Sequence, residues 1–304
     1  MRPFKQQPFA SLPALPREPH SFFDVPATAL SVTDDHFGTV TTPCRVLGSG
    51  PPLLLIHGLM TSGYSWRYAL APLSEHFTLY IPDLVGSGEA DMPDVSYAPD
   101  HLADWIGAAM DALSIRGCAV IGNSMGGYLT MRLALRQPDA MARLVNLHSP
   151  GVPMLRLHAL RAALSLPGSE ALLRWLITRD PMRWAHQNVH YYDETLKSLE
   201  EATEYSRPLK RREGIRAFYR ILKETMNPAE MPGFLAALKA DFPVPLQLVY
   251  AQQDPMVPPM VGDRLAALRP DAPFVRLTEA SHFAHVDATD QFVAAVLPFL
   301  LSPS

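Results

Sequence analysis

The chain has 304 residues, of which 48% are hydrophobic and 18% charged, so it can bury a sizeable core and is too apolar to be disordered. Its 26 basic and 30 acidic side chains leave a net charge of −4, which argues against a nucleic-acid-binding surface. Without an apolar run of about 18 residues, we expect no membrane partner. Two cysteines, Cys44 and Cys118, are too few for a disulfide framework and favour a reduced, cytoplasmic setting.

The first thirty residues are rich in proline and contain six of the chain's 30 prolines. They lack the apolar stretch of a secretory signal, so we predict neither a signal peptide nor an anchor there. Proline favours extended backbone and cannot donate to a sheet. We therefore predict that residues 1–38 form an arm that lies along the surface.

From about residue 39 onward, short apolar runs alternate with segments of helical periodicity. The runs at 53–56, 79–81, 118–121, 144–147 and 246–250 are apolar on both faces, which is typical of strands in a covered parallel sheet, and a final strand is expected at about 273–277. Helices are expected near 64–74, 98–114, 124–136, 258–268 and 287–301. This alternation predicts an α/β fold with a doubly wound, mostly parallel sheet.

One stretch, residues 151–240, breaks the alternation because it contains almost only helical signals, interrupted by prolines. Ninety residues without a convincing strand predict a helical insertion lying over one edge of the sheet. The core would then comprise residues 39–150 and 241–304. The alternative is that these helices pack within the main core.

The strongest chemical signal is the sequence GNSMGG at 122–127, a G-x-S-x-G pattern between a predicted strand and a predicted helix. A serine on such a tight turn is lifted out of the sheet, and the flanking glycines avoid side-chain clashes. Ser124 is therefore the predicted nucleophile. The N–H of Met125, at the start of the following helix, is a predicted oxyanion donor.

A serine nucleophile needs a base, and the base needs a carboxylate to orient it. Asp254 directly follows the strand predicted at 246–250, where a parallel sheet would place a catalytic acid. Asp241 precedes that strand and Asp263 falls within a helix, so both lie at the wrong place. We predict that Asp254 is the acid.

The chain contains eleven histidines, each of which is a candidate for the base. His282 lies on the loop after the last predicted strand, at the edge of the sheet where Ser124 is expected. His285 is the alternative, although packing or a hydrogen bond to the loop would explain it equally well. We predict His282 as the base.

A second oxyanion donor is expected after the strand at 53–56. There Gly58 allows the chain to turn so that the N–H of Leu59 faces the serine, and each such donor contributes roughly 2.7–4 kcal/mol. We expect His57 to bond the backbone and hold this loop.

Together these residues make the chain similar to the α/β-hydrolase fold superfamily. The resemblance covers about residues 39–301 and includes HGLMTSGYSW at 57–66, PDLVGSGEAD at 82–91, GNSMGG at 122–127, YAQQDPMVP at 250–258 and SHFAHVD at 281–287. The family usually has glycine before the histidine, where this chain has Ser281. The resemblance implies that 151–240 is a helical cap that roofs the active site.

The resemblance also limits which of the superfamily's reactions we expect this chain to catalyse. Haloalkane dehalogenases and epoxide hydrolases of this superfamily carry aspartate where this chain has Ser124. The carbon–carbon bond hydrolases usually have a longer glycine-rich oxyanion loop and tryptophan after the histidine, where this chain has Phe283. We therefore predict hydrolysis of carboxylic esters, with a carbon–carbon bond or lactone hydrolase as the alternative and a non-catalytic binding protein as a third option.

The expected partner is a small-molecule ester. No cysteine–histidine spacing indicates a metal site, and we expect no cofactor. The basic cluster at 207–212 is expected to be a solvated helix face. The oligomeric state stays open, with a homodimer as one option.

Overall fold

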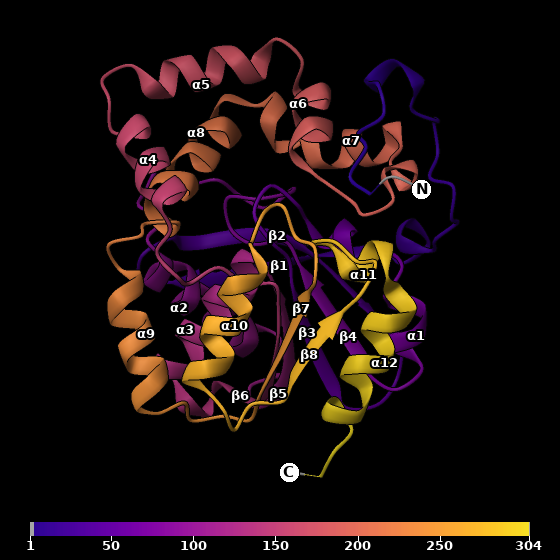
Figure 1. The fold of residues 1–304 in the computed structure, drawn as a ribbon, viewed down its shortest axis with the longest axis vertical. Coiled ribbons are helices and arrows are strands. Elements are labelled where there is room, and N and C mark those ends of the chain that lie inside the picture. Colours follow the sequence, from indigo (N-terminus) through magenta and orange to yellow (C-terminus); the bar gives the residue numbers. More distant parts are fainter. Residues whose placement is uncertain (1–2, 304) are drawn as a thin grey trace.

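A mostly parallel, eight-stranded sheet runs through the molecule in the computed structural model, which describes residues 3–303 (Figure 1). In chain order the strands are β1 (Ala27–Asp34), β2 (Gly38–Leu47), β3 (Pro52–Ile56), β4 (Thr78–Pro82), β5 (Cys118–Asn123), β6 (Met141–Leu147), β7 (Leu246–Ala251) and β8 (Phe274–Leu277). Their order across the sheet is β1-β2-β4-β3-β5-β6-β7-β8. The predicted fold class is thereby confirmed.

The strands β3 to β8 pair in parallel, whereas β1 and β2 are antiparallel to their neighbours. All six predicted strands are present, as β3 to β8. β1 and β2 are not among the predicted strands, and β1 lies in the range predicted as an arm. β1 is mostly exposed, with only Val32 buried along it. An edge strand that faces water on one side has no continuous apolar run.

Helices cover both faces of the sheet. The helices α2 (Pro99–Ala112), α3 (Met125–Arg136), α9 (Met231–Ala240) and α10 (Pro259–Leu268) contribute to the apolar core on one face. The other face is covered by α1 (Leu70–Ser74) and α12 (Thr289–Leu300). Neighbouring residues of one strand enter opposite cores, as Leu54 and Leu55 of β3 do. This period of two explains why the predicted strands are apolar on both faces.

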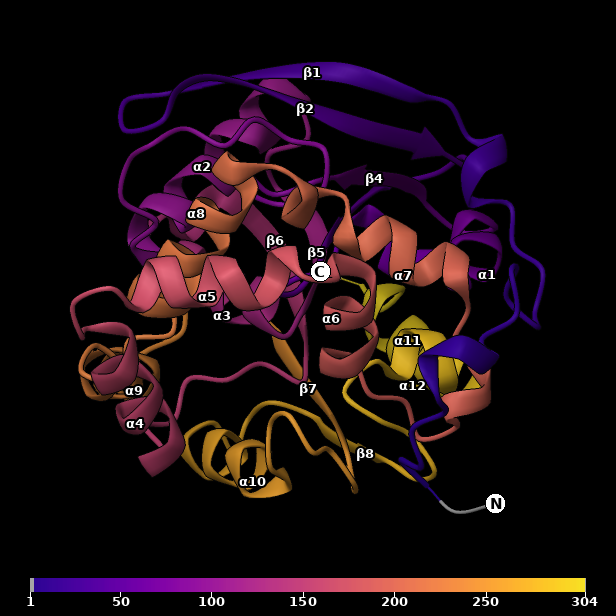
Figure 2. The ribbon, with the colours of Figure 1, turned by 90° about the horizontal axis from the view of Figure 1, so that it is seen from above.

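A layer of further helices, here called the cap helices, lies above the carboxyl ends of the parallel strands (Figures 1 and 2). It comprises α4 (Leu155–Leu164), α5 (Ser169–Thr178), α6 (Pro181–Asn188), α7 (Leu199–Ser206), α8 (Arg212–Arg220) and the π-helical turn η7 (Ile221–Thr225). α9 also belongs to the range predicted as an insertion, but it packs beside α3 and α10. The remaining short elements are η1 (Phe9–Ser11), η2 (Phe22–Asp24), η3 (Gly63–Trp66), η4 (Pro138–Ala140), η5 (Glu194–Leu196), η6 (Pro208–Lys210) and α11 (Ala284–Asp287).

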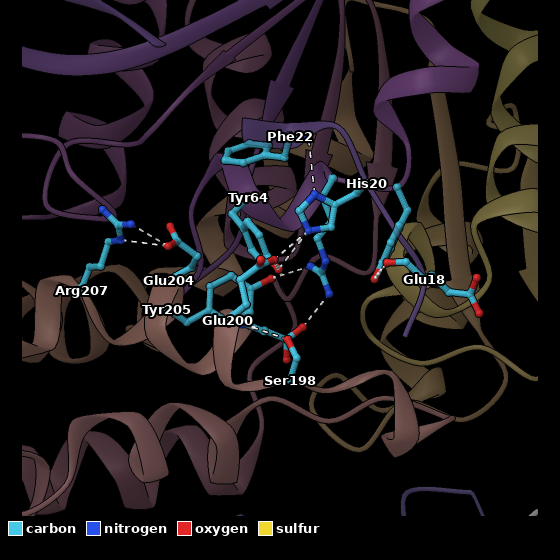
Figure 3. A network of polar contacts seen from close by, with 12 residues as sticks. Glu18, His20, Phe22, Tyr64, Ser198, Glu200, Glu204, Tyr205 and Arg207 are labelled. Carbon is cyan, nitrogen blue, oxygen red and sulfur yellow. Dashed lines mark hydrogen bonds and ion pairs between the residues drawn. The ribbon is translucent and has the colours of Figure 1, made fainter. Parts of the chain in front are cut away.

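The N-terminal arm, residues 3–26, runs along α6 and α7 and contacts the core next to them. Its backbone accepts hydrogen bonds from the N–H groups of Leu199 and Glu200 at the start of α7. Figure 3 shows the polar network at its end, where His20 and the hydroxyl of Tyr64 both bond Glu200 Oε1, at 2.8 and 2.7 Å. Because Tyr64 belongs to the core and Glu200 to α7, the arm connects the two.

None of the helices within residues 3–303 combines the length and the apolar character needed to cross a bilayer.

Candidate active site

Ser124 occupies a sharp turn between β5 and α3. Its backbone has φ +54° and ψ −120°, a conformation that non-glycine residues rarely adopt and that a strand-to-helix nucleophile turn requires. Close approach explains the neighbouring glycines: a Cβ on Gly126 would lie 2.5 Å from the Ile56 carbonyl oxygen, and one on Gly122 would lie 2.7 Å from that of Gly126. The structure thus has the turn predicted from G-x-S-x-G.

His282 and Asp254 lie together at the carboxyl edge of the sheet, although 28 positions separate them in the chain. His282 Nδ1 donates to Asp254 Oδ2 at 2.7 Å, and both side chains are buried. The second carboxylate oxygen accepts hydrogen bonds from the N–H groups of Met256 and Val257, at 2.7 and 2.8 Å. These three donors hold the carboxylate in one orientation. The predicted acid and base are therefore paired.

The charge state of this pair suits a base and its orienting acid. Burial raises the pKa of the Asp254 carboxyl, but the facing His282 imidazole, by its charge and its hydrogen bond, lowers that pKa below the usual range. An ionised Asp254 keeps the ring proton on Nδ1 of His282. The Nε2 lone pair of His282 is then free to accept a proton.

Ser124 and His282 line the same cavity, which has a volume of about 350 Å³. The structure of residues 3–303 contains no hydrogen bond between these two side chains, and their proximity is shown by the cavity that both line. Catalytic hydrogen bonds often tighten only when substrate is bound. The third predicted member of the triad is thus placed at the same site as the other two.

The loop after β3 is held by two hydrogen bonds to the Gly58 carbonyl, and the Leu59 N–H points away from them. The Gly58 carbonyl accepts hydrogen bonds from His57 Nδ1 at 2.9 Å and from the Thr61 hydroxyl at 3.0 Å. In a trans peptide the N–H points opposite to the carbonyl, and Leu59 itself lines the cavity. This arrangement suits the predicted oxyanion donor. Met125, whose N–H is the other predicted oxyanion donor, is the first residue of α3 and its N–H has no partner within the helix.

His57 holds this loop from within the core, as expected. Its Nε2 accepts a hydrogen bond from the Leu84 N–H at 2.9 Å, so its proton lies on Nδ1. Burial lowers the pKa of His57, despite the opposing charge of Asp83, and keeps the ring neutral. The ring therefore supports the oxyanion loop and does not line the cavity.

His285, the alternative base, lies elsewhere. It is fully buried, and its ring packs on Trp66 with centroids 4.4 Å apart. Burial lowers the pKa of His285 well below its usual value, and neither ring nitrogen has a hydrogen-bond partner among the described residues. This arrangement favours packing as its role.

A further histidine near the site was missed by the sequence analysis. His148 follows β6, with φ +54°, and its ring centroid lies 5.7 Å from that of His282. Its Nε2 accepts a hydrogen bond from the Ala251 N–H at 2.6 Å, and burial lowers the pKa of His148 to about 3. The ring is therefore a neutral link between β6 and β7. The only signal in the sequence was its position after a predicted strand.

The cavity has mostly apolar walls, contributed by both the core and the cap helices. Leu157 and Leu160 come from α4, and Leu222 from η7. The remaining lining residues are Gly58, Leu59, Ser124, Pro150, Met154, Arg156, Met226, Met256, Val257, His282 and Phe283. The cap helices thus roof the site, and the cavity is suited to an uncharged, apolar group near Ser124.

A serine on a strand–turn–helix elbow, beside a paired histidine and aspartate at the edge of a parallel sheet, defines a hydrolase of the nucleophile-elbow type. The chain belongs to the alpha/beta hydrolase family, whose model matches residues 53–295. This result confirms the predicted superfamily.

Characterised relatives carry several hydrolase activities. The chain is 26% identical to a 2-hydroxymuconate semialdehyde hydrolase of Pseudomonas sp. (strain CF600), over 83% of this chain and 88% of that one. It is 27% identical to haloalkane dehalogenase 2 of Mycobacterium tuberculosis, over 82% and 88% of the two chains. A solved thermophilic esterase from Thermogutta terrifontis shares the fold, with a TM-score of 0.73 and 19% identity over 90% of this chain and 98% of that one.

Proposed function

We propose that this protein is a serine esterase that cleaves carboxylic esters of small to medium apolar substrates through an acyl-enzyme. The observation that carries the proposal is that Ser124, on its elbow, lines a roofed apolar cavity together with His282, whose ring is hydrogen-bonded to Asp254. Serine at this position supports acyl transfer, since a hydroxyl forms an ester with the acyl group that water can later hydrolyse.

In the proposed mechanism, Ser124 Oγ attacks the ester carbonyl carbon while His282 Nε2 takes the hydroxyl proton. The N–H groups of Leu59 and Met125 stabilise the oxyanion of the tetrahedral intermediate. The carbon–oxygen bond to the alcohol then breaks, and His282 returns the proton to the leaving alkoxide. A water molecule, deprotonated by His282, attacks the acyl-enzyme, and collapse of the second intermediate releases the acid and regenerates Ser124.

The cap helices should limit the length of the acyl chain. Each buried CH₂ stabilises binding by about 0.8 kcal/mol at most, so kcat/KM should rise severalfold for every two carbons until the cavity is full. A longer chain would then clash with Leu160 or Leu222 of the roof. We expect a preference for short to medium acyl chains and no rate jump above the solubility limit of the ester.

A second candidate is cleavage of a carbon–carbon bond in a vinylogous diketone, with the same triad. It is favoured by the likeness to the 2-hydroxymuconate semialdehyde hydrolase. The loop after β3, HGLMTSG, and Phe283 after the base differ from the pattern usual in that branch. Because of these differences, we propose ester hydrolysis ahead of carbon–carbon bond cleavage.

The proposal is tested by measuring kcat/KM for p-nitrophenyl esters from acetate to palmitate, beside a lactone and a vinylogous diketone. Ser124→Ala serves as the control for background hydrolysis. The proposal predicts a maximum at a short or medium ester. If kcat/KM is far higher for the diketone or the lactone, the esterase proposal is wrong and that other substrate class takes its place. A maximum at palmitate would contradict the proposed limit that the cap helices set on acyl-chain length.

A further inference from the structure

One charged side chain of the cavity has no part in the mechanism described above. Arg156 lies in the first turn of α4 and lines the cavity together with Ser124 and His282. Its guanidinium donates from Nη1 to the Pro255 carbonyl at 3.3 Å and from Nη2 to the Met256 carbonyl. These two residues follow Asp254 directly, so the guanidinium is held above the loop of the catalytic acid.

The guanidinium retains capacity for a further ligand. Arginine has five N–H donors, and the two carbonyl oxygens use two of them. The residue is exposed, so its remaining donors are in reach of a molecule entering the cavity. A planar guanidinium with free donors matches a carboxylate, which it can bind through two parallel hydrogen bonds.

The surroundings favour an anion at this end of the cavity. Among the described lining residues, Arg156 is the sole permanently charged side chain, and no acidic side chain lines the cavity. Asp254 lies behind the lining and is bonded to His282 and to two backbone N–H groups. Its charge acts on Arg156 from there, without a direct hydrogen bond between the two side chains among the described residues. Leu157, Leu160 and Met154 offer no charge to compete for Arg156. An electrostatic interaction with a ligand is stronger beside such low-dielectric walls than in open water.

We propose that Arg156 determines specificity by binding a carboxylate that the ester substrate carries at the end remote from the scissile bond. This proposal rests on the proposed esterase function and names its substrate class: an ester with an apolar middle and an anionic terminus. A role of Arg156 limited to tethering α4 to the Asp254 loop would affect all esters alike.

The experiment compares two matched pairs of esters. The acyl-side pair is p-nitrophenyl hexanoate and the mono-p-nitrophenyl ester of adipic acid, in which a carboxylate replaces the terminal methyl group. The alcohol-side pair is 4-methylphenyl butanoate and 4-(butanoyloxy)benzoate. For each pair the selectivity is the kcat/KM of the anionic ester divided by that of the neutral one. Any general effect on the Asp254 loop, or of the leaving group, cancels when the selectivities of variant and wild type are compared.

The variants are Arg156→Gln, Arg156→Lys and, as a matched control, Arg161→Gln. Arg161 lies on the same helix α4, bonds the Lys223 carbonyl at 3.2 Å and does not line the cavity. The selectivity of at least one pair should fall by about tenfold in Arg156→Gln, since that fold-change is typical of a lost charge-assisted hydrogen bond. Arg156→Lys, which keeps the charge, should retain part of it, and Arg161→Gln should match the wild type.

A second measurement needs no variant. Raising the salt concentration to about 0.5 M shortens the Debye length to about 4 Å, so the selectivity of the wild type should fall while the rates on neutral esters change little. Selectivities of both pairs that are unchanged in Arg156→Gln and insensitive to salt would overturn the proposal, as would an equal loss in Arg161→Gln. If wild-type enzyme turned over neither member of any pair, the esterase function itself would fail.

Discussion

A buried ion pair between Arg67 and Glu201 joins the core to α7, so removing one of its two partners should strongly destabilise the protein. Arg67 Nη2 lies 2.6 Å from Glu201 Oε2, and both side chains are at most 4% exposed. The Tyr191 hydroxyl donates to the same carboxylate oxygen at 2.6 Å. The guanidinium also lies over the rings of Tyr64 and Tyr68, 4.5 and 4.6 Å from their centroids.

We expect Glu201→Ala to lower the free energy of unfolding by about 3–5 kcal/mol. The substitution leaves the Arg67 guanidinium buried without its counter-charge, and one unpaired charge in a protein interior costs this amount. The Tyr191 hydroxyl loses its acceptor at the same time, which places the loss toward the upper end of the range. Glu201→Gln keeps a hydrogen-bond acceptor in place and should be less damaging.

The assay is chemical denaturation of the wild type and the variants at equal pH and salt, followed by tryptophan fluorescence and circular dichroism. Glu204→Ala is the matched control on the same helix, because Glu204 pairs with the exposed Arg207 and should contribute less than about 1 kcal/mol. The double variant Arg67→Met/Glu201→Leu should be more stable than Glu201→Ala, since no charge remains buried. A Glu201→Ala variant as stable as Glu204→Ala would refute this reasoning.

Further predictions concern the proposed triad and a buried carboxyl. Ser124→Ala should lower ester turnover about 10⁴-fold and abolish labelling by a fluorophosphonate, and a folded variant with about a tenth of the activity would contradict this. Asp254→Asn should cost up to about 10⁴ in kcat because the histidine tautomer is lost. His282→Ala should remove the acyl-enzyme burst, whereas His285→Ala should mainly lower stability. A larger loss of kcat in His285→Ala than in His282→Ala would show that the base is assigned to the wrong histidine. Burial raises the pKa of Asp287 to about 6, so the folded state favours its protonated form. The stability of the wild type relative to Asp287→Asn should therefore be greatest below about pH 4 and fall as pH rises through about 6, and a constant difference would contradict it.

The parts of the site that were predictable are those with a local signal in the sequence. Ser124, Asp254 and His282 each follow a predicted strand. β5 and β7 are almost entirely buried, whereas β8 at the edge of the sheet is only partly buried. Parallel strands bring their carboxyl ends to one edge, so three loops far apart in the chain were expected to meet there. The sequence patterns alone therefore predict that Asp254 and His282 lie at the same edge of the sheet.

The parts that could not be predicted depend on packing between distant segments. The edge strand β1 has too few buried residues to differ from the arm before it. Nothing near His148 indicates that its ring would accept a hydrogen bond from Ala251, more than a hundred positions away. Arg156 was one of several arginines at helical spacing, and its place in the cavity follows only from where α4 crosses the Asp254 loop.

The N-terminal arm has a consequence for how the chain acquires its structure. The hydrogen bonds from Gln6 to the His186 carbonyl and between His20 and Glu200 each join residues 180 positions apart. The part of the arm that bonds α6 and α7 is synthesised long before those helices, so these hydrogen bonds can form only after both helices have been made and have packed on the core. Closing so long a loop is entropically costly, and contacts of high sequence separation form late. The arm should therefore dock in the last folding step, and its docking should report that α6 and α7 have reached their places.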